Sequence, residues 1–127
     1  MKTFGMRFIA ASLIVVFSTP GLISCGAASK YQKTVVEARE SVLRDDLYQM
    51  RKLIDQYTVD NGKPPQSLED LARAGYLREV PDDPMTGKKD WRVIMAESPS
   101  GKGEKGVVDI RSASTANSTD GKPYSEW

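Results

Sequence analysis

Apolar residues recur at helical intervals through the middle of this 127-residue chain. From about Tyr31 to Asp60 there is no proline or glycine, and large apolar side chains follow at steps of seven, four, three, four and three. They are Val36, Leu43, Leu47, Met50, Ile54 and Tyr57. This spacing predicts a long helix with one core-facing side. Asn61-Gly62 supplies a left-handed stop, and Pro64-Pro65 prevents continuation. The first two turns, Tyr31 to Arg39, have fewer large apolar residues, so we expect them to project as a stalk.

A second, shorter helix is predicted after the two prolines. Ser67 is a candidate N-cap, and Asp70 stands at the third helical position, as in a capping box. Leu68 and Leu71 would face the core, and Gly75 would end the helix.

Two strands are predicted in the second half of the chain. A turn-rich connector, Pro81–Gly87, comes first, and we expect its acids to serve in turns and caps. In residues 91–96, two sets of residues then occupy alternate positions, which is typical of a half-buried strand. These sets are Trp91, Val93 and Met95, and Arg92, Ile94 and Ala96. The polar stretch Ser98–Gly106 would connect this strand to a returning one, Val107–Arg111.

The C-terminal part of the chain, Ser112–Lys122, is rich in Ser, Thr, Asn and Gly and is expected to be irregular. Burial of Tyr124 and Trp127 would pin this tail to the body. The predicted fold class is α+β: a long N-terminal helix packed on a small antiparallel sheet, with a short second helix and an irregular C-terminal loop.

The first residues of the chain are typical of an export signal. Lys2 and Arg7 give a positive start, and Phe8–Phe17 is a short apolar run. Pro20-Gly21 then breaks any helix. Because the run is well short of the roughly 20 residues that span a bilayer, a signal peptide is favoured over a membrane-spanning helix. The run Leu22-Ile23-Ser24-Cys25 follows and is similar to a bacterial lipobox.

Cys25, the only cysteine, is therefore the predicted lipidation site and mature N-terminus. The alternative is a chance cysteine near an ordinary cleavage site. The expected organisation is a lipoprotein-type signal peptide at 1–24, a short tether at 25–30 and one domain at 31–127. Lipidation would hold the protein in the cell envelope, on a membrane facing the periplasm. Gly26, which is not an aspartate, slightly favours the outer membrane.

The net charge of the chain is close to zero, so it produces no strong electrostatic field. The chain has 18 Lys and Arg against 17 Asp and Glu; residues 1–24 hold two of the basic residues and none of the acidic ones, which leaves 16 against 17, or −1. This balance argues against nucleic acid as a partner. The chain has no histidine and no Gly-x-Ser-x-Gly motif. The pairs Asp45-Asp46 and Asp82-Asp83 are adjacent in sequence, and neighbours on a helix do not face each other. We therefore expect neither an enzyme nor a small-molecule substrate.

The order of several segments after residue 31 resembles the globular domain of the major pseudopilin of type II secretion. The segments that carry this resemblance are Leu43–Tyr57, Asn61–Pro65, Ser67–Leu71, Gly75–Leu77, Val80–Pro84, Asp120-Gly121 and Tyr124–Trp127. It covers roughly residues 32 to 127, and no single motif in it is diagnostic. The resemblance implies a pilin-like fold, in agreement with the order of elements predicted above.

The N-terminus departs from that family. Pseudopilins have a glycine followed by Phe-Thr-Leu-x-Glu and a continuous apolar helix, whereas here Gly5 is followed by Met6–Ala10. The leader contains no acidic residue, and Pro20-Gly21 interrupts its apolar run. A lipid anchor would thus replace the polymerising element.

The family also implies a calcium site in the C-terminal loop. Asp109–Ser112 resembles the strand that enters this loop, and Asp120-Gly121 resembles its first acidic turn. The candidate ligands here are Ser112 and Asp120, since calcium takes oxygen ligands. The second acidic segment is replaced by Lys122–Trp127, so we expect the domain to fold without metal and without any other cofactor.

The resemblance, combined with the predicted lipid anchor at Cys25, implies a non-catalytic, lipid-anchored component associated with a type II secretion or type IV pilus-like export machine, whose proteins would be its partners. The alternative is a stand-alone periplasmic or surface binding module on a pilin-like scaffold.

Overall fold

The longest element is a single helix, α1 (Cys25–Asn61), of 37 residues. At about 1.5 Å per residue it is roughly 55 Å long. The computed structural model describes residues 25–99 and 102–127, so the predicted signal peptide lies outside the described residues. Gly62 follows the helix in the left-handed conformation, with φ of 69°, as its sequence predicts. Among the described residues, no helix has the length and apolar character needed to cross a membrane.

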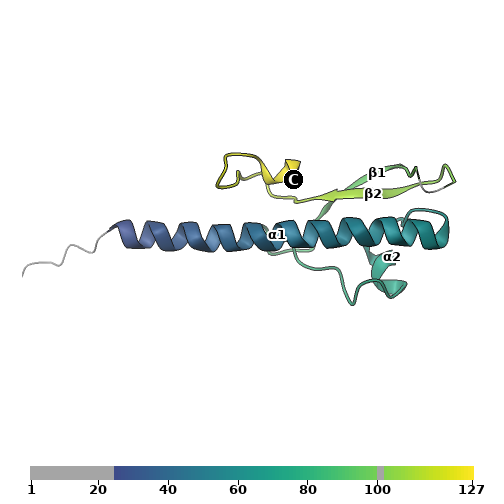
Figure 1. Ribbon diagram of the computed structural model, residues 1–127, viewed down its shortest axis with the longest axis horizontal. Coiled ribbons are helices and arrows are strands. Elements are labelled where there is room, and N and C mark those ends of the chain that lie inside the picture. Colours follow the sequence, from purple (N-terminus) through teal and green to yellow (C-terminus); the bar gives the residue numbers. More distant parts are fainter. Residues whose placement is uncertain (1–24, 100–101) are drawn as a thin grey trace, which may run out of the picture.

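The helix begins earlier than predicted. Residues 25–30, expected to be a tether, are helical. This stretch has two alanines and no proline, which offsets the low helix propensity of Gly26. Residues 26–34 are all exposed, and Figure 1 shows this end of α1 projecting beyond the rest of the protein. The predicted stalk is therefore confirmed, and we use this name for residues 25–39.

The second helix, α2 (Leu68–Arg73), forms where it was predicted. The Asp70 carboxylate accepts hydrogen bonds from the main-chain N–H groups of Gln66 (2.8 Å) and Ser67 (3.2 Å), which satisfies donors at the start of the helix. Leu68 and Leu71 are buried. In the view of Figure 1, α2 and the sheet lie on opposite sides of α1.

The two strands, β1 (Arg92–Glu97) and β2 (Lys105–Arg111), form an antiparallel pair. Ile94 pairs with Asp109 and Met95 pairs with Val107, so Val108 is an extra residue that forms a β-bulge. Val107 and Ile110 are three residues apart and would otherwise point to opposite faces of the sheet. The bulge lets both reach the core, where they are fully buried.

The alternation predicted for the first strand is present, and the structure shows which set faces inward. Ile94 and Ala96 are partly buried, whereas Val93 and Met95 are 41% and 50% exposed. Trp91 is buried but precedes the strand, and its indole N–H donates a hydrogen bond to the Pro81 carbonyl (2.8 Å). The strand β2 also starts two residues before the predicted Val107.

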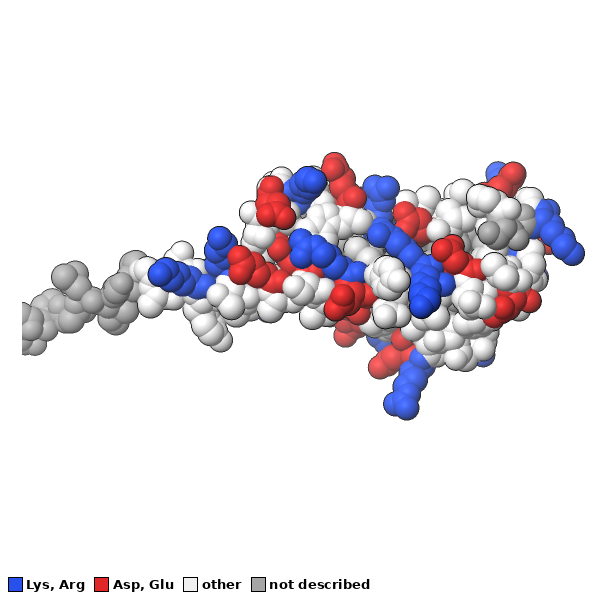
Figure 2. All heavy atoms as spheres, in the orientation of Figure 1, with Lys and Arg blue, Asp and Glu red and all other residues white. Residues whose placement is uncertain are grey.

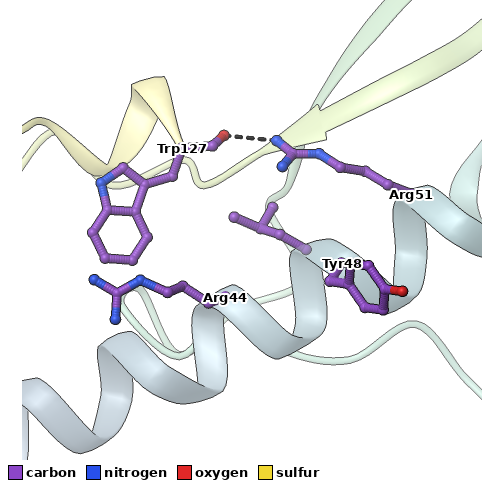
Figure 3. Close-up of a pocket in the computed structure, with 5 residues that line it drawn as sticks. Arg44, Tyr48, Arg51 and Trp127 are labelled. Carbon is purple, nitrogen blue, oxygen red and sulfur yellow. Dashed lines mark hydrogen bonds between the residues drawn. The ribbon is translucent and has the colours of Figure 1, made fainter.

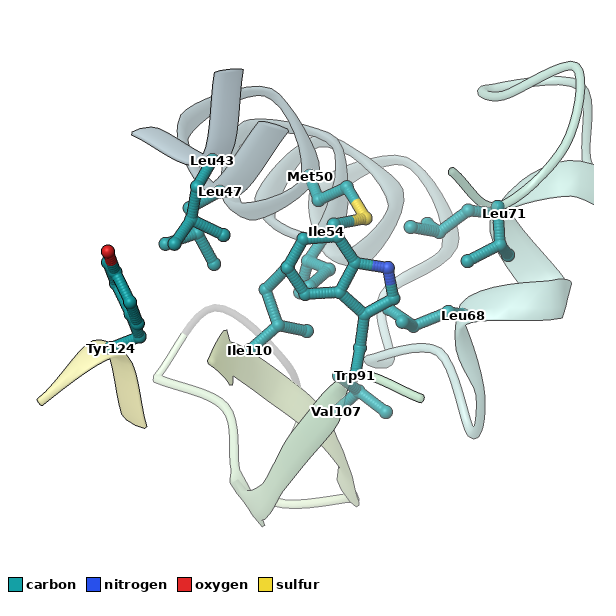
Figure 4. Packing of buried hydrophobic residues seen from close by; sticks show 11 residues of the cluster. Leu43, Leu47, Met50, Ile54, Leu68, Leu71, Trp91, Val107, Ile110 and Tyr124 are labelled. Atoms are coloured by element: carbon teal, nitrogen blue, oxygen red, sulfur yellow. The ribbon is translucent and has the colours of Figure 1, made fainter. Parts of the chain in front are cut away.

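The core lies against one face of α1. Leu43, Leu47, Met50 and Ile54 are buried along this face, as predicted, and Val36 and Tyr57 at its ends are partly buried. Side chains from α2, from β2, from the connecting segments and from the tail pack on it (Figure 4). They are Leu68, Leu71, Val80, Trp91, Val107, Ile110 and Tyr124. The described chain is thus α+β, with one long helix, one short α-helix and a two-stranded antiparallel sheet.

The segment after α1 closes tightly on the start of β2. A Cβ atom on Gly106 would lie 2.6 Å from Pro64 Cγ and 2.7 Å from the Pro65 carbonyl oxygen. That same oxygen accepts a hydrogen bond from the Val107 N–H (2.7 Å). Glycine is therefore required at residue 106, because the two backbones approach too closely for any side chain.

We expect Leu47→Ala or Ile54→Ala to lower the free energy of unfolding by about 2–5 kcal/mol, because each removes a large side chain from this core. Denaturant unfolding of both variants measures the loss. Val59→Ala is the control: Val59 is 65% exposed on the same helix, so its effect should stay within about 0.5 kcal/mol. Equal midpoints for all three variants would contradict the assigned core face.

Candidate functional site

The predicted lipidation site, Cys25, is the first residue of α1. Its side chain lies outside the described residues, so lipidation stays a prediction. The position does show what the anchor would be joined to. A lipid on Cys25 would lead directly into the exposed stalk, without an intervening loop.

Ser112, one of the two candidate calcium ligands, is fully buried. Its hydroxyl donates a hydrogen bond to Asp83 Oδ2 (2.6 Å) and accepts one from the Ser114 N–H (3.1 Å). The Asp83 carboxylate also accepts from the N–H groups of Met85 (2.8 Å) and Ala113 (3.1 Å). Asp83 is thus confirmed as a turn residue, and it ties the connector to the start of the tail.

Asp120, the other candidate ligand, is exposed in a turn closed by a hydrogen bond from the Gly121 N–H to the Ser118 carbonyl (2.9 Å). In the described part of the chain, no three His, Cys, Asp or Glu side chains gather as a metal ion would require. Calcium binding at Ser112 and Asp120 therefore stays an untested prediction, and the structure gives the Ser112 hydroxyl another role.

A buried carboxylate that the sequence interpretation missed joins the tail to α1. Glu40 is only 2% exposed. Its Oε1 accepts hydrogen bonds from the Thr119 N–H (2.6 Å) and the Tyr124 hydroxyl (2.8 Å), and its Oε2 accepts one from the Thr119 hydroxyl (2.8 Å). Three donors from the tail thus converge on one side chain of the helix.

The hydrogen bonds decide the charge state of this group. Burial by itself would raise the pKa of Glu40, but the bonds from Thr119 and Tyr124 and the nearby Arg44 guanidinium outweigh it and hold the pKa below its ordinary value. The same arrangement raises the pKa of Tyr124 to about 12, through burial and then through its bond to the Glu40 carboxylate. At neutral pH, Glu40 is ionised and Tyr124 is a neutral donor.

About one turn and about three turns after Glu40 on α1, two arginines hold the end of the tail. The Arg51 guanidinium donates to Asp109 Oδ1 (2.6 Å) and to the main-chain oxygens of Ile110 (2.8 Å) and Trp127 (2.7 Å). Arg44 lies over the Trp127 ring, 4.3 Å from its centroid, and Tyr124 packs edge-on against the same ring at 5.3 Å. The predicted pinning of the tail by Tyr124 and Trp127 is confirmed.

A shallow groove of about 270 Å³ lies between this end of the tail and α1 (Figure 3). Its lining consists of apolar, aromatic and cationic side chains and contains no acid. The lining residues are Arg44, Leu47, Tyr48, Arg51 and Trp127.

A signal for Glu40 was present in the sequence. The predicted apolar face of α1 has one step of seven residues, from Val36 to Leu43, and Glu40 occupies the helical position inside that gap. A single acid on a core-facing stripe needs buried donors. The tail residues that supply these donors come from nearly 80 positions further along the chain, as Thr119 shows.

Comparisons of the chain with models of known families, with curated proteins and with solved structures returned no match. The site therefore has to be interpreted from its own geometry. Both fully buried acids, Glu40 and Asp83, are satisfied by protein donors and join separate parts of the fold.

Replacing Glu40 by glutamine should make stability less sensitive to acid. Because the folded-state pKa of Glu40 lies below its ordinary value, its contribution to stability is present above the ordinary pKa and is lost as the pH falls through the lower folded-state pKa. At pH 7 we expect Glu40→Gln to cost about 1–3 kcal/mol, since tail donors lose a charged acceptor. Wild type and variant should converge in acid, as measured by urea unfolding at a series of pH values.

Glu37→Gln is the matched control for this experiment. Glu37 is an exposed acid one turn earlier, 3.8 Å from Lys33, and its removal should leave the pH dependence nearly unchanged. Parallel pH profiles for wild type and Glu40→Gln would show that the buried carboxylate does not hold the tail as described.

Proposed function

We propose that this protein is a non-catalytic, lipid-anchored, pseudopilin-like component associated with a type II secretion or type IV pilus-like export machine. The observation that carries the proposal is the stalk. The described helix includes the predicted lipidation residue, Cys25, and runs from it without interruption into the body. Its first turns are exposed, so they are available to neighbouring proteins.

The stalk is suited to act as a rigid spacer. Its 15 residues are roughly 22 Å long as a helix. A contact within the helix supports it away from the body, since Lys33 pairs with Glu37 at 3.8 Å. An i,i+4 pair of this kind contributes about 0.3–0.5 kcal/mol. Such a spacer would hold the body at a defined distance from a membrane.

The surface charges favour protein partners over polyanions. In Figure 2, basic and acidic side chains are interspersed over the visible face, and neither sign dominates a large area. This agrees with the near-neutral composition. Contacts with individual partner proteins would be weak, and confinement on one membrane would strengthen them by raising the effective concentration.

The pilin-like part of the proposal rests on the order of elements and on the resemblance of the sequence segments. A long helix followed by an antiparallel pair of strands packed against it is compatible with a small pilin-like domain. The absence of an acid and the early Pro20-Gly21 in the leader are why we propose a protein that is held beside such a machine by lipid.

Lipidation of Cys25 is the first expectation. Mass spectrometry of the membrane fraction should find a diacylglyceryl-modified N-terminal peptide that begins at Cys25. Cys25→Ser protein should leave the membrane fraction, because the several acyl chains contribute about 0.8 kcal/mol for each buried methylene. Identical fractionation of wild type and Cys25→Ser would count against the anchor.

Photocrosslinking in cells tests the partner class. Photoreactive residues at Gln32 and Arg39, both exposed on the stalk, should recover proteins of a secretion or pilus machine. A photoreactive residue at the exposed Glu69 of α2 is the control for non-specific capture. Crosslinks to unrelated soluble proteins only, with secretion intact after deletion of the gene, would favour the stand-alone binding module instead.

A further inference from the structure

The groove between α1 and the tail has at one end a cation, Arg44, whose hydrogen-bond donors are not used by the described residues. Arg44 is exposed, and its guanidinium stacks on Trp127 at 4.3 Å. It makes no hydrogen bond to any residue in the described part of the chain. The nearby Glu40 carboxylate does not need these donors, because both of its oxygens already accept bonds from Thr119 and Tyr124. The in-plane N–H groups of Arg44 are therefore open to a ligand.

The wall formed by Trp127 is held in place before any ligand arrives. Arg51 donates to the main-chain oxygen of Trp127 (2.7 Å; dashed line in Figure 3), and Tyr124 packs edge-on against the indole. Stacking on this ring restricts the Arg44 side chain. Binding there loses less conformational freedom than binding to a mobile surface arginine would.

The rest of the groove is apolar and aromatic. Leu47 lines it between the two arginines, and Tyr48 is 65% exposed, with no hydrogen bond or ring contact to another described residue. Arginine, tyrosine and tryptophan are the residue types that most often dominate binding energy in protein interfaces. A groove of about 270 Å³ accommodates one or two side chains of a partner.

We infer that this groove binds an acidic segment of a partner polypeptide, in which a carboxylate pairs with Arg44 and a neighbouring apolar side chain lies against Leu47, Tyr48 and Trp127. The planar guanidinium matches a carboxylate in bidentate geometry. No Asp or Glu side chain lines the groove to compete with it. The apolar lining favours a peptide over a bare phosphate, which would leave these side chains uncovered. The inference deepens the proposed function by naming a surface and the chemistry of its partner.

Nuclear magnetic resonance of the full-length protein in detergent micelles tests the inference. The probe is a six-residue peptide of alternating glutamate and phenylalanine, compared with the same peptide carrying glutamine for glutamate, and with inorganic phosphate. The chain has two tryptophans, and Trp127→Phe identifies their indole signals. The acidic peptide should shift the Trp127 signal and leave that of Trp91, which is buried and bonded to Pro81.

We expect the glutamine peptide to bind about tenfold more weakly, and Arg44→Gln to weaken binding of the acidic peptide by about tenfold. Tyr48→Ala should also weaken it, and this variant leaves the tail contacts intact. Arg78→Gln removes an exposed arginine outside the groove and should have no effect. Weaker binding at higher salt is expected as well.

Three results would overturn the inference: equal binding of the two peptides, unchanged binding in both Arg44→Gln and Tyr48→Ala, or a shift produced equally well by phosphate alone. The experiment is independent of the crosslinking test. Failure here would leave the stalk as the proposed contact surface, and failure of crosslinking would leave a peptide-binding domain without a secretion partner.

Discussion

In the described part of the chain, the hydrophobic core is built against one face of α1. Leu43, Leu47, Met50 and Ile54 form the apolar surface that α2, β2 and the tail share. Because a two-stranded hairpin is marginal by itself, β1 and β2 depend on this helix for their stability. The β-bulge at Val108 follows from the same requirement, since the strand next to the helix must present Val107 and Ile110 together.

The tail poses a different problem, because residues 112–123 have no regular helix or strand to satisfy their main-chain groups. Buried polar side chains take over this role. Asp83 accepts from Ser112 and Ala113 at the start of the tail, and Glu40 accepts from Thr119 further along. Arg51 then donates to the main-chain oxygen of Trp127 at the end. These bonds give an irregular segment a defined path, which in turn forms the wall of the groove.

Local patterns were sufficient to predict the elements, and long-range contacts explain what was missed. The end of α1 and the position of α2 follow from Gly62, the two prolines and Asp70, which all act within a few residues. The inward face of β1 could not be assigned, because Val93 and Ile94 are both apolar and only the folded structure shows that Ile94 is the more buried of the two. Similarly, the partners of Glu40 lie 79 and 84 residues away along the chain, a separation that periodicity does not detect. The groove also depends on long-range contacts between α1 and the tail. The sequence therefore showed its residues only as separate positions in the helix and in the tail.

Because α1 is continuous from the stalk into the part that carries the core, the stalk fixes the orientation of the globular part. Each helical residue turns the chain by about 100° and advances it by about 1.5 Å. Inserting or deleting one residue between Cys25 and Arg39 would therefore rotate the globular part around the helix axis, while hardly changing its distance from Cys25 along that axis. An insertion of seven residues would nearly restore the rotational orientation and would move the globular part about 10 Å further from Cys25 along the helix axis. The length of the stalk thus determines the rotational orientation of the globular part around the helix axis. Natural variation in the length of this segment should favour changes that preserve the helical phase.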